Sequence, residues 1–146
     1  GKLTYTTSNK AVATVDAAGK VTVKGLGVAK ITVKAAATTD YKAASKTVTV
    51  TVAPKKQSIS LVNKIKKQLT IKWKKNTKAS GYQVVYSTNK KFTGKKTVRK
   101  AKTTTSYKIK GLKKGKKYYV KVRSYKTVNG KRIYGAYSTA KKATIK

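Results

Sequence analysis

Residues 111–127 read GLKKGKKYYVKVRSYKT, and this stretch decides the fold of the second part of the chain. After two glycines, Tyr118, Val120 and Val122 alternate with Tyr119, Lys121, Arg123 and Tyr125. Because successive side chains of a strand point to opposite faces, the first set is predicted to face inward and the second outward. The stretch also holds seven lysines and arginines and no acid. It is therefore either a binding surface for something negatively charged or the solvated face of a lysine-rich strand.

The same alternation continues on both sides of this stretch. Strand patterns occur in QLTIKWKK (68–75), GYQVVYS (81–87), TSYKIKG (105–111) and KKATIK (141–146). The positions predicted to face inward are Leu69, Ile71, Trp73, Tyr82, Val84, Tyr86, Tyr107 and Ile109. VNGK (128–131) is an Asn-Gly signal for a two-residue hairpin turn. Short strands with turn signals at this spacing predict an antiparallel sandwich.

The first part of the chain alternates in the same way. Strand patterns occur in VATV (12–15), KVTVKG (20–25), AKITVKA (29–35) and KTVTVTV (46–52), and in the last three Val or Ile stands at every second place. DAAGK (16–20) and GLG (25–27) are predicted turns, and AAATTDYKAA (35–44) is a predicted loop. The predicted fold is thus all-β, with two antiparallel β-sandwich units in tandem and no helix longer than a turn or two. The units are residues 1–53 and 58–146, and residues 54–57, around the single proline, form the linker.

The charge of the chain is very uneven. Lys and Arg number 38 against two acids, Asp16 and Asp40, which gives a formal net charge of +36. Residues 1–53 carry eight lysines and both aspartates, whereas residues 54–146 carry thirty cations and no acid. The second part therefore forms no ion pair between its own side chains. A solvated surface normally mixes charges of both signs, so solvation alone does not account for the missing acids.

This composition excludes several kinds of metal site and catalytic centre. With no His and no Cys, the usual zinc and copper sites, disulfides and thiol nucleophiles are absent. Two carboxylates in the whole chain are too few for a paired-acid hydrolase or a typical calcium site. Nothing singles out one lysine as a nucleophile. We therefore expect no catalytic residue, no metal, no cofactor and no enzyme activity.

Targeting signals are not visible in the sequence. No apolar run approaches the about 20 residues of a membrane span, and no signal peptide opens the chain. The chain begins at Gly1 without a methionine, so we expect an excised segment or mature fragment whose targeting information lies outside it.

Residues 58–146 resemble a fibronectin type III domain. Trp73 matches the core tryptophan of that family's second strand, and YQVVYS matches the Tyr-x-Val-x-Tyr pattern of its third. Leu112, Gly115 and Tyr118 are in register with the family's tyrosine corner, a structural feature, although Lys114 replaces the usual proline. The resemblance covers nearly all of the second unit and implies that Trp73 and Tyr118 are structural.

Residues 1–53 resemble a bacterial Ig-like domain. LTYTTSNKAVATVDAAGKVTVKGLGVAKITV (3–33) follows that family's run of Ser-Asn, Val-Ala-Thr-Val, Asp, Gly-x-Val and Gly-x-Ala-x-Ile. The family usually has one or two strands before the position of Leu3. We therefore expect this unit to lack its first strands, being cut at the boundary or completed by something else.

The two resemblances imply a role outside the cell. Such modules are usually spacers, adhesins or attachment domains of larger proteins, and the lysine-rich style resembles surface or secreted proteins of Gram-positive gut bacteria. We expect an extracellular, secreted or cell-surface module that attaches to polyanions such as teichoic acid, sulfated or sialylated mucin, or heparan-like chains. The residues assigned to polyanion binding are Lys113, Lys114, Lys116, Lys117, Lys121, Arg123 and Arg132.

Several alternatives remain at this point. Nucleic-acid binding would be phosphate-driven only, because three arginines against 35 lysines do not suit base readout. The charge could instead serve solubility in a spacer without a partner, or a released type III polypeptide could be an irisin-like ligand of a host receptor. A sharper site is an aromatic platform for a sugar ring, formed by Tyr119, Tyr125, Tyr134 and Tyr137. The alternative is that these tyrosines pair with lysines across strands and stabilise an exposed sheet face.

Overall fold

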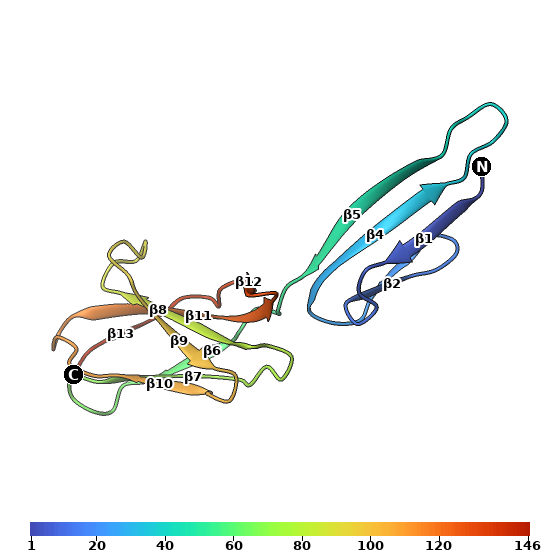
Figure 1. Cartoon of the computed structure of the whole chain (residues 1–146). Coiled ribbons are helices and arrows are strands. Elements are labelled where there is room, and N and C mark those ends of the chain that lie inside the picture. Colours follow the sequence, from blue (N-terminus) through green and yellow to red (C-terminus); the bar gives the residue numbers. More distant parts are fainter. The chain divides into compact units, whose positions relative to one another are not determined.

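The computed structural model describes residues 1–146 as strands, turns and loops, with no helix (Figure 1). All paired strands are antiparallel, so the predicted all-β class is confirmed. The chain divides into two compact units, Gly1–Ala53 and Pro54–Lys146.

The first unit contains a three-stranded sheet and a two-stranded hairpin. The sheet has the order β1-β4-β5, and the hairpin pairs β2 with β3. The strand bounds are β1 Leu3–Thr7, β2 Ala13–Val15, β3 Val21–Val23, β4 Gly27–Ala35 and β5 Ala44–Val52. The predicted loop lies between β4 and β5, and β1 is a strand that the sequence patterns did not single out.

The turn between β2 and β3 is fixed by its aspartate. The Asp16 carboxylate accepts hydrogen bonds from the backbone N–H groups of Ala18 (3.0 Å) and Lys20 (2.9 Å). Gly19 has a φ of +83° and lies under the Tyr5 ring, where an added Cβ would meet a ring carbon at 2.8 Å. The predicted turn at DAAGK is therefore confirmed, and only glycine suits its fourth position.

The core of the first unit is small. Val12, Ala13 and Ala29 form its buried cluster, with Val50 and Val52 packed against it. Several large apolar side chains of the same unit stay exposed, among them Leu3 (50%), Val21 (41%), Val23 (55%) and Val48 (52%). This exposure fits a sandwich with too few strands, but the absence of the family's first strands stays a prediction.

The second unit is a sandwich of two sheets. One has the order β10-β7-β6; the other has the order β12-β11-β8-β9, with β13 also pairing with β11. Since β11 is long, β13 pairs with its first part and β12 with its last part. The strand bounds are β6 Ile59–Val62, β7 Leu69–Trp73, β8 Gly81–Ser87, β9 Lys96–Ala101, β10 Ser106–Ile109, β11 Lys117–Val128, β12 Lys131–Tyr134 and β13 Lys141–Thr144.

The core of the second unit lies between these two sheets. Trp73 and Tyr82 pack at its centre, with ring centroids 5.4 Å apart. Every position predicted to face inward is in this cluster or packed against it. The buried members are Ile59, Leu69, Ile71, Trp73, Tyr82, Val84, Tyr86, Ile109, Leu112, Val120, Val122 and Ile145.

Strand β8 differs from the half-buried pattern of its neighbours. All seven of its residues are buried, including Gln83 and Val85, which face away from the core. The strand lies between β11 and β9, and side chains from β11 and from the loop before β9 cover its outer face. The alternation correctly placed the inward residues of this strand, but it did not indicate the burial of its other face.

The Asn-Gly hairpin turn is present between β11 and β12. Asn129 and Gly130 have φ angles of 48° and 75°, the positive values of a two-residue type I′ turn. This turn sets the register in which Tyr125 lies opposite Tyr134 and Thr127 opposite Arg132. It therefore brings residues of the predicted tyrosine platform to neighbouring strands.

Candidate functional site

The four lysines before and at the start of β11 lie on a rigid turn. This lysine turn, residues 113–117, is closed by a hydrogen bond from Lys116 N to Lys113 O (3.2 Å). Gly115 N donates to Ile145 O (2.8 Å), and Ile145 N donates to Lys116 O (3.0 Å). All four lysine side chains are exposed, so the turn presents four ammonium groups from a fixed backbone.

The tyrosine corner connects this turn to the core through the Tyr118 side chain. The Tyr118 hydroxyl accepts a hydrogen bond from Lys113 N at 3.4 Å, while the Tyr118 ring packs against the core. Leu112 is buried beside it. The expected structural role of Tyr118 is therefore confirmed, and its ring is not part of an exposed platform.

The outward face of β11 carries a row of alternating cations and aromatic rings. The Arg123 guanidinium lies 3.8 Å from the Tyr134 ring centroid and 4.3 Å from that of Tyr137. Lys121 Nζ lies 4.4 Å from the Tyr137 centroid and 4.1 Å from that of Phe92. We call this row the cation–aromatic ladder; its members are Phe92, Lys121, Arg123, Tyr125, Arg132, Tyr134 and Tyr137.

The other end of the ladder is made by Tyr125, Tyr134 and Arg132. The Tyr125 and Tyr134 rings meet edge to face at 5.6 Å, and the Arg132 guanidinium lies 5.5 Å from the Tyr125 centroid. Tyr125 extends over Gly81 on β8, where an added Cβ would meet the Tyr125 hydroxyl at 2.6 Å. The missing side chain at Gly81 thus gives Tyr125 room to cross the neighbouring strand.

Gln83 fixes the centre of the ladder. Its side-chain oxygen accepts from Arg123 Nε at 2.7 Å and from the Tyr137 hydroxyl at 3.0 Å. A buried amide oxygen with two donors holds Arg123 in one orientation, since the guanidinium is planar and its donors are fixed. The main role of Arg123 is therefore to stabilise the fold.

Burial also changes the chemistry of Lys121. Its half-buried position lowers the pKa of the Lys121 ammonium, and the nearby charges of Lys95 and Arg123 lower it further. The rings of Phe92 and Tyr137 partly compensate for the lost water, because a ring face attracts a cation.

The structure brings most of the predicted site residues together, but in two groups. Lys113, Lys114, Lys116 and Lys117 form the exposed turn, while Lys121, Arg123, Arg132, Tyr125, Tyr134 and Tyr137 belong to the ladder. Tyr119 faces the same side as Lys121 and lies opposite Ser87, yet it makes no ring contact with the ladder. Cations lie over the rings of Tyr134 and Tyr137, which restricts their use as a stacking platform.

Two residues that hold the ladder together, one of them a member, were not singled out from the sequence. Gln83 is a polar residue in the middle of an apolar strand, which is a signal that could have been followed. Phe92 is the chain's only phenylalanine and lies in a polar loop. It is buried, and its backbone has a φ of 61°, a costly conformation for a large side chain.

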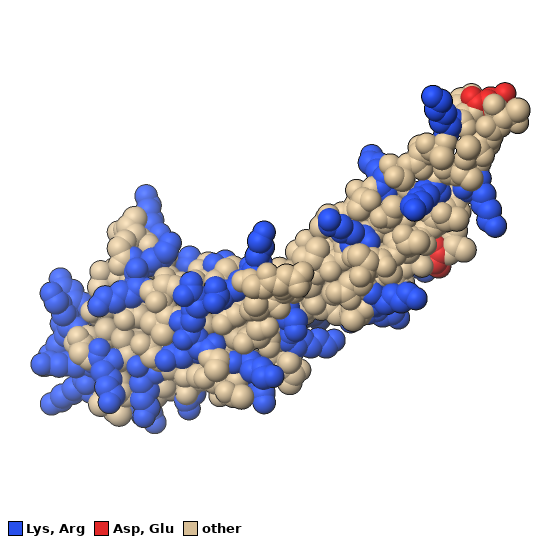
Figure 2. All heavy atoms as spheres, in the orientation of Figure 1, with Lys and Arg blue, Asp and Glu red and all other residues tan.

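The cations cover the second unit widely. Figure 2 shows blue side chains over the visible surface of that unit and red ones on the first unit alone. Because the chain forms no helix, it has no helical segment that could span a membrane.

Comparison with protein families supports both resemblances. Residues 1–38 match the model of the intimin immunoglobulin-like domain, and residues 52–139 match the fibronectin type III domain. The predicted succession of the two domain types is thereby confirmed. Domains of these families usually occur in extracellular proteins, and the type III domain is typically a non-catalytic fold. A search of curated proteins found no match.

Solved structures show the same fold at low sequence identity. The three fibronectin domains FN1–FN3 of chicken CNTN1 match with 18% identity and a TM-score of 0.56. That match covers 87% of this chain and 47% of the other, so this chain spans about half its length. The sixth type III domain of human fibronectin type III domain containing protein 3 matches with 16% identity and a TM-score of 0.54, covering 66% and 89% of the two chains. A myokine structure matches with 15% identity and a TM-score of 0.50, covering 64% and 98%.

Proposed function

Because the chain belongs to the fibronectin type III family through residues 52–139, we propose a role typical of such domains. In this proposal the chain is an adhesive, non-catalytic module of a larger bacterial surface or secreted protein. It attaches that protein to polyanionic polymers outside the cell, namely sulfated or sialylated host glycans or wall teichoic acids. The attachment rests on many lysines acting together and not on one shaped pocket.

The observation that carries this proposal is the complete absence of acids from residues 54–146 beside thirty cations. None of these cations is neutralised by a side chain of the same unit. A polyanion supplies the missing counter-charge and releases the small ions condensed around it, which favours binding. A large single-sign field of this kind also raises the association rate with a partner of opposite charge.

The exposure of the cations supports assigning this role to some of them more than to others. Arg123 is held by Gln83 and two rings, and Lys121 is half-buried, so both contribute mainly to the fold. The lysine turn is different, because its four side chains are exposed and its backbone is fixed. Ammonium groups act as point charges without a required plane, which suits a polymer whose groups vary in position.

The direct experiment measures binding to immobilised heparin, sulfated mucin and teichoic acid at low and at physiological salt. We expect binding at low salt that weakens steeply with salt, because released counterions set the slope. Changing Lys113, Lys114, Lys116 and Lys117 to Gln lowers affinity. The matched control changes Lys72, Lys74, Lys75 and Lys78, four exposed lysines on and after β7, and lowers it less.

The outcomes separate the proposal from its alternatives. Failure of all three polymers to bind at low salt overturns it and leaves a spacer without a polyanionic partner. Saturable binding to host cells that resists salt favours the receptor-ligand alternative. Tight binding of one glycan at high salt that is lost in Tyr119→Ala favours a shaped aromatic site.

A further inference from the structure

A cleft lies at the end of the second unit where β8 ends and β11 begins. Its volume is about 250 Å³, below the range of about 300–1,000 Å³ typical of drug-sized ligands. It therefore suits a small group rather than a whole oligosaccharide. The residues that line it are Tyr86, Ser87, Thr88, Gly94, Lys96, Lys110, Gly111, Leu112, Lys113 and Tyr118.

The cleft wall contains one nearly buried hydroxyl without a partner in the protein. Tyr86 is 9% exposed, and its hydroxyl makes no hydrogen bond within the protein. The other hydroxyls of the wall differ, since Ser87 donates to Thr93 O at 2.8 Å, Tyr118 accepts from Lys113 N, and Thr88 is exposed to solvent. A nearly buried polar group that opens onto a cleft is satisfied there by solvent or by a ligand.

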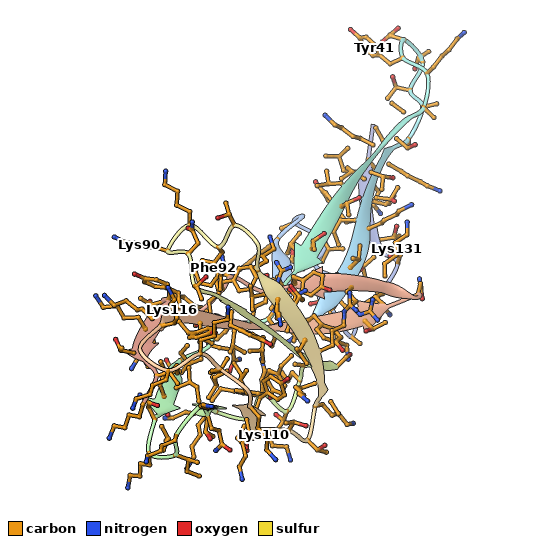
Figure 3. The ribbon with its side chains drawn as sticks, turned by 90° about the vertical axis from the view of Figure 1, so that its left-hand side faces the viewer. Tyr41, Lys90, Phe92, Lys110, Lys116 and Lys131 are labelled. Carbon is orange, nitrogen blue, oxygen red and sulfur yellow. The ribbon has the colours of Figure 1, made fainter.

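The remaining polar groups of the cleft are mostly donors. Lys96 lies opposite Tyr86 in the strand register, so both side chains leave the same side of the sheet. Lys110 and Lys113 enter from the segment that precedes β11, and Figure 3 labels Lys110. Burial raises the pKa of Tyr86, so its phenol remains protonated and able to donate. No acid lines the cleft.

We propose that this cleft seats one terminal oxyanion ester of a sugar, a sulfate or phosphate monoester, with Tyr86, Lys96, Lys110 and Lys113 as its donors. The inference rests on the proposed function and adds to it a defined seat for one group of the polymer. A monoester hangs from its sugar by a single bond and presents three free oxygens, so it enters a narrow cleft end-on. The phosphodiester of a polymer backbone is substituted on both sides and does not enter in this way.

The test uses N-acetylglucosamine 6-sulfate, its 6-phosphate analogue and the unsubstituted sugar as probes, followed by NMR titration of the full chain. We expect both esters to bind and the unsubstituted sugar not to bind. Changing Lys96 and Lys110 to Gln lowers affinity for the esters by about tenfold or more, because each lysine donates a charge-assisted hydrogen bond to the ester. Tyr86→Phe, which removes one oxygen, lowers it by a smaller factor.

The matched control changes Lys102 and Lys131 to Gln. Both are exposed, and the register places them by the end of the sheet where Tyr125 lies opposite Gly81 and Tyr134, away from Lys96. The net charge falls equally in the two double variants, so diffuse attraction predicts equal losses. Lys131 is labelled in Figure 3, apart from Lys110.

The results distinguish this inference from the proposed function. Equal losses in the two double variants, with heparin still bound by the wild-type chain, overturn the cleft and leave polymer attachment intact. The opposite result is also possible. If the wild-type chain binds the esters but none of the three polymers, and the Lys96/Lys110 variant loses ester binding, the cleft is supported and polymer attachment is overturned. Failure of both esters to bind overturns the cleft.

Discussion

At the scale of single residues, the polar atoms of two buried aromatic side chains have different surroundings. Trp73 is 6% exposed and its indole N–H has no hydrogen-bond partner, while the Tyr86 hydroxyl opens onto the cleft. An unpartnered buried donor gives up part of the stability that its ring contributes. The two positions therefore separate the contribution of a ring from that of its polar atom.

Trp73→Ala is expected to cost about 3–5 kcal/mol of unfolding free energy, because it leaves a cavity between the two sheets. Trp73→Phe is expected to cost much less, since the lost N–H makes no hydrogen bond. Urea unfolding followed by circular dichroism measures both. A Phe variant as unstable as the Ala variant would show that the indole N–H has a partner in solution.

The stability of the second unit is expected to fall at alkaline pH in part through Tyr86. Its pKa is raised in the folded state, first by desolvation and then by Tyr107 and Tyr118. Above the ordinary value of about 10, the unfolded chain loses this proton while the folded chain keeps it, so unfolding is favoured as pH rises.

Urea unfolding of the wild type and Tyr86→Phe at neutral and alkaline pH measures this contribution, with Trp73 fluorescence as the probe. The variant is expected to lose less stability than the wild type between the two pH values. Tyr41→Phe, at an exposed position of the other unit, is the control and should behave as the wild type. An equal loss in all three proteins contradicts the prediction.

At the scale of strands, alternation predicted which side chains of β7, β10 and β11 face the core, because each strand has one wet face. It could not predict the second buried face of β8, since Val85 and Gln83 are covered by side chains from other elements. Edge strand β9, with the sequence KTVRKA, lacks a clear apolar period and was not singled out. Most members of the ladder were named from the sequence, but its supports Gln83 and Phe92 were not, because they come from two separate segments whose contacts with β11 the alternation does not show.

Arg123→Lys is expected to destabilise the second unit by about 1–2 kcal/mol, through the lost bond to Gln83 and weaker contact with two rings. Arg99→Lys is the control, because Arg99 lies on the same face, opposite Gln83, but is exposed. Thermal unfolding compares the two variants at equal net charge. Equal stability of the two proteins would show that the ladder contributes nothing to the fold.

At the scale of the whole molecule, the two units differ in how they are stabilised. The second has a large closed core but thirty mutually repelling cations, whereas the first has a small core and a lower charge. Hydrogen exchange is expected to be faster for backbone amides in residues 1–53 than in 58–146, because a small, partly open core protects its strands poorly. Equal protection of the two segments would show that the first unit is complete as a domain.

Anions that bind the folded second unit are expected to raise its melting temperature beyond simple screening, by mass action on the native state. Sulfate should therefore stabilise more than chloride at matched ionic strength. Millimolar concentrations separate binding from the general exclusion of sulfate from protein surfaces, because binding saturates. Calorimetry measures the shift, and identical curves in the two salts would contradict specific anion binding.

The backbone hydrogen bonds of the lysine turn affect how easily proteases cleave the protein there. Trypsin-like proteases cleave after Lys and Arg, so this chain carries potential cleavage sites throughout both units. Such enzymes need a segment free of its backbone hydrogen bonds, and Gly115 and Lys116 are held to Ile145 by two of them. Digestion of the turn then proceeds through transient opening and follows the free energy of opening. The rate at which proteases cut this turn is therefore expected to depend on its strand pairing and not on its lysine content.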